Sequence, residues 1–269
     1  MGSIPLIAAL PMYDWPEARE ETDAEWARLK EGLAERGVAA PPRLTRRNGD
    51  MPAVPGGITD RDGRVIAPDP ATLPPDEFDV HVLWRHPGLL LAQTCWGPLE
   101  QGLANHVTVI GQPDYSAQEG GQGEFYRSAI VMRAGSGAAD VPAPGGPDAA
   151  IDVEALRGTR FTYNGADSMS GIIALRRDLA RLGAIANEAA FEAFWSGASV
   201  SGGHRQSVIA VAEGAADVAA IDCRSLDLCR RFEPATEEVR VVGWTALRKG
   251  LPYIAAPALA QPISLSSSG

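Results

Sequence analysis

Short apolar runs alternate with amphipathic stretches along most of the 269-residue chain. Residues 4–11 (IPLIAALP) and 89–95 (LLLAQTC) are continuous apolar runs, which predict buried strands because they are too short for stable helices. Residues 17–36 instead place Trp26, Leu29 and Leu33 at helical spacing among charges, and Gly37 stands where such a helix would end. Strand-like and helix-like runs follow one another, so the pattern predicts an α/β protein with a parallel sheet.

The same reading assigns the rest of the chain. Further strands are predicted at 42–47, 78–84, 107–113, 124–133, 160–164, 217–222 and 237–245. Further helices are predicted at 97–105, 171–183, 187–197, 204–213 and 224–232. Proline and glycine are dense in the remaining segments, which predicts an insertion loop at 48–77 with at most a small hairpin around 61–67, a loop at 136–150 and a flexible tail at 263–269.

Charge and composition exclude several functions. The net charge is −10 and Lys and Arg form no run, so the chain is not expected to bind nucleic acid. No apolar stretch approaches the roughly 20 residues of a membrane span, and no secretory leader is visible, so we expect no membrane insertion and either a cytoplasmic protein or a periplasmic one whose leader has been removed. The three cysteines form no metal-type pair and are expected to be buried, with at least one free. We expect no metal and no cofactor.

Residues 163–171 (YNGADSMSG) join a predicted strand to a predicted helix through hydroxyl and glycine residues. The first N–H groups of a helix have no partner within it, so Ser168, Ser170 and Gly171 are candidates to hold an oxyanion. Ser168 also suits the role of helix cap, which the sequence alone favours over ligand binding. The sequence leaves both roles open.

Other predicted strand ends also carry polar or aromatic residues. His204 opens a predicted helix after two glycines and suits either a ligand contact or a cap; Asp222 ends a strand and suits a ligand site or an N-cap. Tyr13, Thr94 and Trp96 follow two further strands, although Trp96 equally suits the core. Tyr126, in the strand predicted at 124–133, completes the set of candidate ligand contacts.

The chain resembles the phosphate/phosphite/phosphonate-type substrate-binding proteins of ABC transporters. The resemblance runs through ALPMYDWPE, LLLAQTCWGP, VTVIGQPDY, FYRSAIVMR, DSMSG, GGHRQSVIAVAEGAADVAAID and LPYIAA. It implies a two-lobed type 2 periplasmic-binding-protein fold, with residues 1–110 and 236–269 in one lobe and 111–235 in the other. The segments at 107–115 and 239–245 would be hinge strands, and the ligand would lie in a cleft that closes on binding.

The resemblance also implies roles for the candidate residues. Ser168, Ser170 and the Gly171 backbone would receive the anionic head of a small oxyanion or phosphonate-like ligand, with His204 donating, as a neutral ring or as an imidazolium, and Asp222 facing the ligand. Tyr13, Thr94 and Trp96 would belong to the other lobe. The partner would be an ABC transporter permease. The alternatives are an enzyme of cofactor biosynthesis, for which His204 and Asp222 form the one conceivable acid–base pair, and an intracellular ligand sensor.

Overall fold

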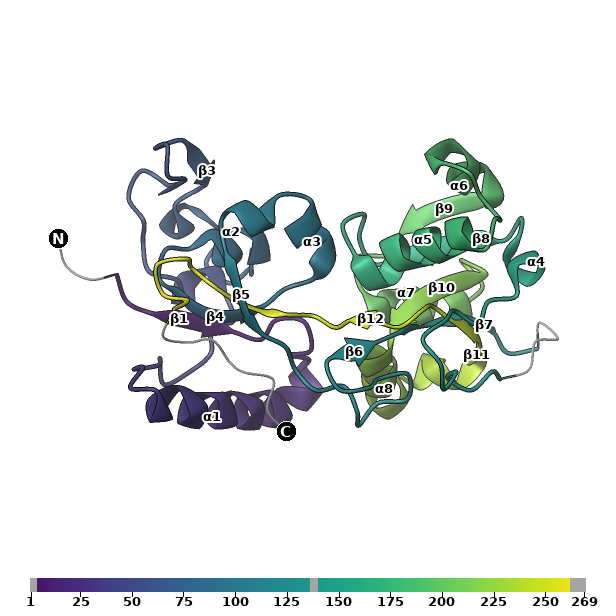
Figure 1. Cartoon of the computed structure of the whole chain (residues 1–269), viewed down its shortest axis with the longest axis horizontal. Helices are drawn as coiled ribbons and strands as arrows, with labels where there is room; N and C mark the ends of the chain where they lie inside the picture. The colour runs from purple at the N-terminus through teal and green to yellow at the C-terminus, as the bar shows by residue number, and fades with distance from the viewer. Residues whose placement is uncertain (1–3, 136–139, 262–269) are drawn as a thin grey trace. The chain divides into compact units, whose positions relative to one another are not determined.

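The computed structural model describes residues 4–135 and 140–261. The chain forms two compact α/β units: unit 1 comprises Met1–Pro113 and Leu251–Gly269, and unit 2 comprises Asp114–Gly250 (Figure 1). The predicted α/β class and division into two lobes are confirmed. The loop predicted at 136–150 lies partly outside the described residues, and the tail predicted at 263–269 lies wholly outside them.

Unit 1 is built on a mixed four-stranded sheet. Its strand order is β1 (Ile7–Ala9), β4 (Leu89–Gln93), β13 (Tyr253–Ala255) and β5 (Thr108–Gly111). Strands β1 and β4 are parallel, whereas β13 is antiparallel to both β4 and β5. The prediction of a parallel sheet is therefore wrong for unit 1. Strand β13 comes from a distant part of the chain and lies between β4 and β5, and the local alternation of strand-like and helix-like runs gives no signal of that insertion.

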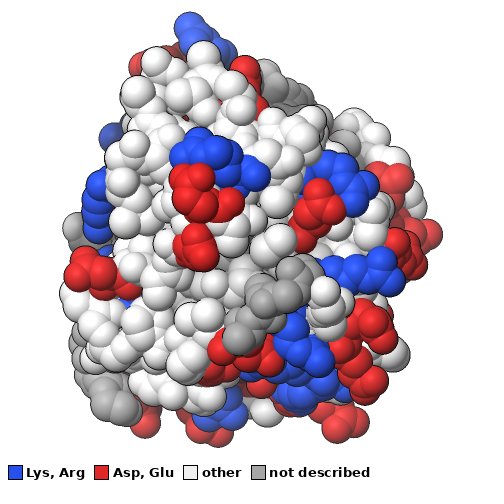
Figure 2. Space-filling view, turned by 90° about the vertical axis from the view of Figure 1, so that its right-hand side faces the viewer, with Lys and Arg blue, Asp and Glu red and all other residues white. Residues whose placement is uncertain are grey.

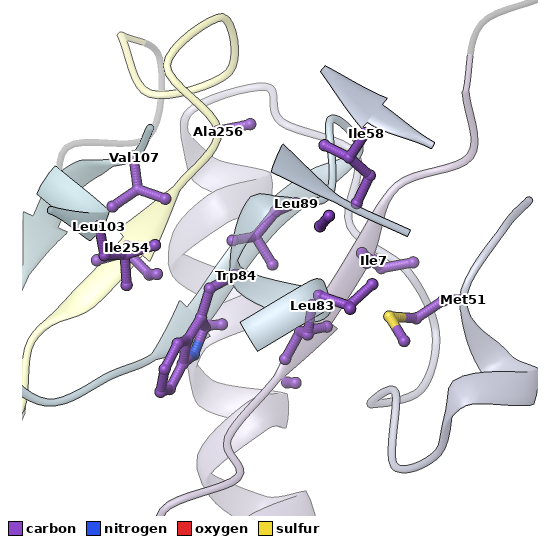
Figure 3. Close-up of a cluster of buried hydrophobic side chains, with 14 of the residues drawn as sticks. Ile7, Met51, Ile58, Leu83, Trp84, Leu89, Leu103, Val107, Ile254 and Ala256 are labelled. Atoms are coloured by element: carbon purple, nitrogen blue, oxygen red, sulfur yellow. The ribbon is translucent and has the colours of Figure 1, made fainter. Parts of the chain in front are cut away.

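Two hydrophobic clusters cover this sheet. Helix α1 (Arg19–Glu35) packs through Trp26 and Leu33 against a cluster that includes Leu90 and Leu91. The second cluster contains Trp84, Leu89 and Ile254 (Figure 3). Three helices contribute buried side chains to it: α2 (Val80–Arg85), α3 (Trp96–Glu100) and the short helix η4 (Leu103–Asn105). Neighbouring residues of β4 thus serve different clusters, which explains why its sequence is continuously apolar.

Two predicted strands of unit 1 are absent from the described residues. Segment 78–84 forms helix α2 instead, because the Asp79 carboxylate accepts hydrogen bonds from the backbone N–H groups of His81 and Val82 and so caps a helix. Segment 42–47 is irregular; its Thr45 N–H donates one bond to the Ala8 carbonyl at 2.7 Å, but the strand pairing goes no further.

The insertion at 48–77 contains the predicted hairpin. Strands β2 (Ile58–Thr59) and β3 (Val65–Ala67) pair in antiparallel fashion, flanked by the short helices η2 (Asn48–Asp50) and η3 (Pro70–Thr72). Met51, Ile58 and Ala67 are buried in the core cluster around Trp84. The insertion is therefore an integral part of the unit 1 core.

Unit 2 is built on a mixed five-stranded sheet. Its strand order is β11 (Val239–Trp244), β7 (Ser128–Arg133), β10 (Val218–Asp222), β8 (Arg160–Tyr163) and β9 (Gly197–Val200). Strands β10, β8 and β9 are parallel, while β7 is antiparallel to β10 and β11. The strand predicted at 124–133 forms two strands, β6 (Phe125–Tyr126) and β7. Strand β6 pairs with β12 (Arg248–Lys249) in a separate two-stranded sheet.

The predicted helices of unit 2 are confirmed. They are α5 (Ala174–Arg181), preceded by a π-helical turn η5 (Met169–Ile173), α6 (Glu188–Phe194), α7 (His204–Ala212) and α8 (Cys223–Phe232), with α4 (Val153–Leu156) and η6 (Pro234–Glu238) in addition. Their core cluster centres on Phe161, whose ring stacks on that of Trp195 with 4.5 Å between centroids. This packing fixes the strand and helices that lead to residues 164–171.

The chain passes between the units at Pro113/Asp114 and at Gly250/Leu251. We expected the second passage at residue 236, with 239–245 as a hinge strand. The structure instead assigns β11 to unit 2, where it pairs with β7 along its length. The correction follows from pairing between strands more than 100 residues apart, for which a single sequence gives no signal.

Candidate functional site

The candidate site of unit 2 lies where parallel strands end. Strands β9, β8 and β10 are adjacent and parallel, so their carboxyl ends share one edge of the sheet. His204 follows β9, the turn 164–171 follows β8, and Asp222 is the last residue of β10. Open α/β sheets bind ligands at this edge. The topology therefore brings His204, which the sequence placed at a helix start, to the same edge as Asp222 and the turn 164–171, which it placed at strand ends. Strand β9 itself was not predicted.

The turn after β8 presents two buried hydroxyl groups. Ser168 is the N-cap of the helix, and its Oγ accepts a hydrogen bond from the Gly171 N–H at 3.0 Å. Ser170 Oγ lies 3.4 Å from Ser168 Oγ, and the two residues are 5% and 3% exposed. The capping role considered for Ser168 is confirmed. The same turn also gathers hydroxyls and helix-start amides in one place.

His204 links this turn to Asp222. Its Nε2 lies 2.8 Å from Ser170 Oγ and 3.2 Å from Asp222 Oδ2. The other carboxylate oxygen of Asp222 accepts from the Ser225 N–H at 2.9 Å, so Asp222 also caps α8, as the sequence allowed. A continuous series of polar contacts thus runs from the Gly171 amide to the N-terminus of α8.

The surroundings favour the neutral form of His204. Burial lowers the pKa of its imidazole, and the charge of Asp222 and the Ala220 backbone oppose that effect without outweighing it. This argues against the imidazolium considered from the sequence. A carboxylate requires a donor, so the hydrogen-bond network assigns the ring proton to Nε2. With the proton there, the single Nε2–H lies between Ser170 Oγ at 2.8 Å and Asp222 Oδ2 at 3.2 Å, and the Ser170 hydroxyl hydrogen is available to donate.

This geometry does not form a catalytic relay. In a Ser–His–Asp triad the serine and the carboxylate contact different ring nitrogens of the histidine. One nitrogen takes up the serine proton, while the N–H of the other nitrogen donates to the carboxylate. Here Ser170 and Asp222 both approach Nε2 of His204. The cysteines offer no nucleophile either, because all three are buried and free and burial raises the pKa of Cys223 and of Cys229 to about 12.

Asn164 is a site residue that the sequence analysis missed. It directly follows β8, and its Oδ1 is buried without a hydrogen-bond partner. A Cβ atom added at Gly171 would lie 1.8 Å from this oxygen, so the Asn164 side chain lies directly against the turn. Its only signal in the sequence is its position at the end of a predicted strand. The serines that follow it are more obvious candidates to bind an anion.

The remaining candidates occupy more ordinary positions. Tyr126 is buried in β6, and its ring packs against that of Tyr115 with centroids 5.4 Å apart. In unit 1, Tyr13 is buried, and Trp96 is partly buried against the core cluster around Trp84, the core role that the sequence allowed. Thr94 is fully buried, and its Oγ1 has no hydrogen-bond partner in the protein. Their roles in ligand binding stay predictions.

Two broader features bear on function. In residues 4–135 and 140–261, no helix has both the length and the apolar character of a membrane span, and no cluster of three or more His, Cys, Asp or Glu side chains is placed to hold a metal. On the face shown in Figure 2, acidic and basic side chains are interleaved rather than segregated. Pairs such as Arg160–Asp217 and Arg157–Glu154 show the same mixing in unit 2, which is unlike a nucleic-acid-binding surface.

The two α/β units, each built on its own sheet, give a fold of the two-lobed α/β class. Residues 103–264, more than half of the chain, match the family described as ABC transporter, phosphonate, periplasmic substrate-binding protein. The chain belongs to this family, which confirms the resemblance noted in the sequence. It is accordingly a non-catalytic solute-binding component of a transporter, and the enzyme alternative is set aside.

Solved structures share the fold at low sequence identity. PhnD1 from Prochlorococcus marinus, in complex with methylphosphonate, has a TM-score of 0.58 and 14% identity, covering 98% of this chain and 80% of its own. A binding protein component of an ABC phosphonate transporter from Pseudomonas aeruginosa has a TM-score of 0.57 and 12% identity, covering 97% and 71%. A histidine kinase sensor domain has a TM-score of 0.51 and 13% identity, covering 97% and 88%. No curated protein matches the sequence.

Proposed function

We propose that the turn at 168–171, together with His204, binds the phosphonate head of a small organic phosphonate, which the protein delivers to an ABC transporter permease. The convergence of two serine hydroxyls, the helix-start amides and a neutral histidine at one sheet edge supports the proposal. A tetrahedral oxyanion accepts hydrogen bonds in several directions, which suits donors arranged around a turn. The family description places such proteins in the periplasm, and we propose that compartment for this chain.

Each residue has a distinct part in this proposal. The N–H groups of Met169 and Ser170 lie in the first turn of the helix, where the helix dipole favours an anion. Ser170 donates its hydroxyl hydrogen to the ligand, since its oxygen already accepts from His204. Asp222 acts as a positioning residue, because its carboxylate lies 3.2 Å from His204 Nε2, the same ring nitrogen that contacts Ser170 Oγ.

Ligand-induced stabilisation tests the proposal. Methylphosphonate at one hundred times its Kd should raise the free energy of unfolding by about 2.7 kcal/mol, and sulfate at the same concentration should raise it less. Ser170→Ala should weaken methylphosphonate binding at least about tenfold, the equivalent of about 1.4 kcal/mol for one lost charge-assisted hydrogen bond. Isothermal titration calorimetry measures both affinities.

A matched control separates binding from folding. Asn187→Ala removes the N-cap of α6, where Asn187 Oδ1 accepts from the Ala190 N–H at 2.9 Å, and this exposed residue lies outside the turn. It should lower stability by about 1 kcal/mol and leave the affinity for methylphosphonate unchanged. Wild-type protein that binds no phosphonate, or Ser170→Ala protein that binds as wild type, would contradict the proposed function.

A further inference from the structure

The hydrogen-bonded edge of unit 2 contains no positively charged side chain of its own. Ser168, Ser170 and Gly171 are neutral, and burial lowers the pKa of His204, so its ring is neutral as well. Asp222 places a carboxylate 3.2 Å from His204 Nε2. A phosphonate dianion bound at this edge would therefore meet neutral donors and one like charge, so a cation near the turn would favour its binding.

Arg177 brings a guanidinium to the start of this turn. The residue belongs to α5 and is exposed, yet its Nη1 lies 3.8 Å from the sulfur of Met169. Met169 is the first helical residue after the Ser168 cap. The two residues are eight positions apart, roughly 12 Å along a helix, so Arg177 extends towards the N-terminus to make this contact. A single methionine side chain thus joins the guanidinium to the turn.

The N-terminus of a helix is an unfavourable place for a cation. The helix dipole puts partial positive charge there, so cations are stabilised near the C-terminus instead. Arg181, the last residue of α5, occupies such a favourable position. A dianion held by the turn would reverse the sign of the interaction for Arg177, because the guanidinium would then lie close to two negative charges.

We propose that Arg177 is a specificity-determining residue that supplies the positive charge for the anion at the turn. Resting on the proposed function, this inference specifies its substrate class by charge, as phosphonate dianions in preference to phosphonate monoesters. Coulomb energy is proportional to the ligand charge, so at a separation of about 10 Å a dianion gains twice as much as a monoanion. Water and salt screen a charge at an exposed position, so the effect should depend on ionic strength.

Arg177→Gln tests the inference by calorimetric titration with methylphosphonate, at a pH above the second ionisation of this ligand. At an ionic strength of about 0.01 M, where the Debye length is roughly 30 Å, the affinity should be about three- to tenfold lower than in wild type. At about 1 M, where that length is roughly 3 Å, the two proteins should bind within about 1.5-fold of each other. Stability should stay close to wild type, because the residue is exposed.

Two further variants separate the local charge from packing and from net charge. Arg177→Lys keeps the charge and should bind methylphosphonate within about twofold of wild type at low ionic strength. Arg181→Gln changes the net charge as Arg177→Gln does, but it lies about 18 Å from residue 169 along the helix, so its affinity should also stay within about twofold. Equal, salt-independent losses in Arg177→Gln and Arg177→Lys would overturn the inference and assign the effect to packing on Met169.

The charge of the ligand gives a second measurement. Methyl methylphosphonate, the monoester, carries one negative charge where methylphosphonate carries two. The loss of affinity in Arg177→Gln at low ionic strength should therefore be smaller for the ester, about the square root of the fold-change for methylphosphonate. Equal losses for the two ligands would contradict selection by charge.

The outcomes separate this inference from the proposed function. If wild-type protein binds methylphosphonate and Arg177→Gln binds it equally well at low ionic strength, or loses no more affinity than Arg181→Gln, the role of Arg177 is overturned while the proposed function stands. If wild-type protein binds no phosphonate, the proposed function fails and this inference fails with it. The comparison of ionic strengths uses methylphosphonate alone, so it decides the role of Arg177 even where the ester does not bind.

Discussion

Replacement of Gly171 by alanine tests how closely the binding turn is packed. Gly171 lies in the helical turn η5, and its backbone is not in the left-handed region, so alanine meets no backbone strain. In an open helix the exchange would stabilise the protein by up to about 1 kcal/mol. At this position, however, the new Cβ would lie 1.8 Å from Asn164 Oδ1 and 3.2 Å from Ser168 Oγ.

The two side chains must therefore move. Displacement of Asn164 is an overpacking effect of about 1–3 kcal/mol, and a weakened Ser168 cap adds about 0.5–2 kcal/mol. After subtraction of a helix-propensity gain of about 1 kcal/mol, we expect a net loss of about 0.5–4 kcal/mol. Each kcal/mol lowers the Tm by roughly 2–4 °C in a protein of this size. Methylphosphonate affinity should also fall at least about tenfold, because the methyl group crowds the turn amides.

Chemical denaturation and calorimetry measure both effects, and two controls assign them. Gly32→Ala in α1, where the nearest atom to the new Cβ is Arg36 Nη1 at 3.4 Å, should stabilise the protein by up to about 1 kcal/mol. Asn164→Ala combined with Gly171→Ala should recover much of the lost stability, so the double-mutant cycle should show a coupling energy above about 0.5 kcal/mol. A Gly171→Ala protein as stable as Gly32→Ala would refute the close packing of Asn164 against the turn.

Two further predictions concern histidines. His204→Gln should keep the methylphosphonate affinity within about fivefold of wild type, because the glutamine amide supplies a neutral donor near the position of Nε2. His204→Leu should lower that affinity at least about tenfold in titration calorimetry. Equal losses of affinity in the two variants would indicate that a charged ring is required. His86, whose Nε2 donates to the Pro52 carbonyl and whose Nδ1 accepts from the Gly88 N–H, has its pKa lowered chiefly by burial. At pH 7.5 the His86 ring is neutral in both the folded and the unfolded protein. As the pH falls below about 6.5, the unfolded chain takes up a proton first, so the free energy of unfolding should fall by at most about 1.4 kcal/mol per pH unit for each such histidine. The pKa of His204 is also lowered by burial, so His204 acts in the same direction. Urea unfolding at pH 7.5 and 5.5 checks this, His86→Gln should reduce the change, and stability that rises towards pH 5.5 would show that the sign is wrong.

Local features of the sequence predicted much of unit 2. Ser168 and Asp222 each stand where a predicted apolar strand gives way to a helix, and parallel strands bring such positions to one edge. Strand β9, which leads to His204, was not predicted, because its four residues (GASV) are exposed and show no apolar pattern. The same reasoning failed at 78–84, where five apolar residues among seven resembled a strand but the Asp79 cap produced a helix. Capping by a single carboxylate outweighs strand propensity in so short a segment.

Long-range pairing explains the remaining errors. The insertion of β13 between β4 and β5, and the pairing of β11 with β7, join segments far apart in the sequence, and alternation of local patterns carries no information about either. Asn164 was missed for a different reason. It is an ordinary polar residue in its sequence context, and only the burial of its Oδ1 without a partner distinguishes it.

The carboxyl edge of the unit 2 sheet is organised within the protein itself. Ser168, Ser170 and His204 are linked by hydrogen bonds, and Asp222 Oδ2 lies 3.2 Å from His204 Nε2. Such a network is held in place before binding, so little reorganisation would oppose the proposed capture of a phosphonate head.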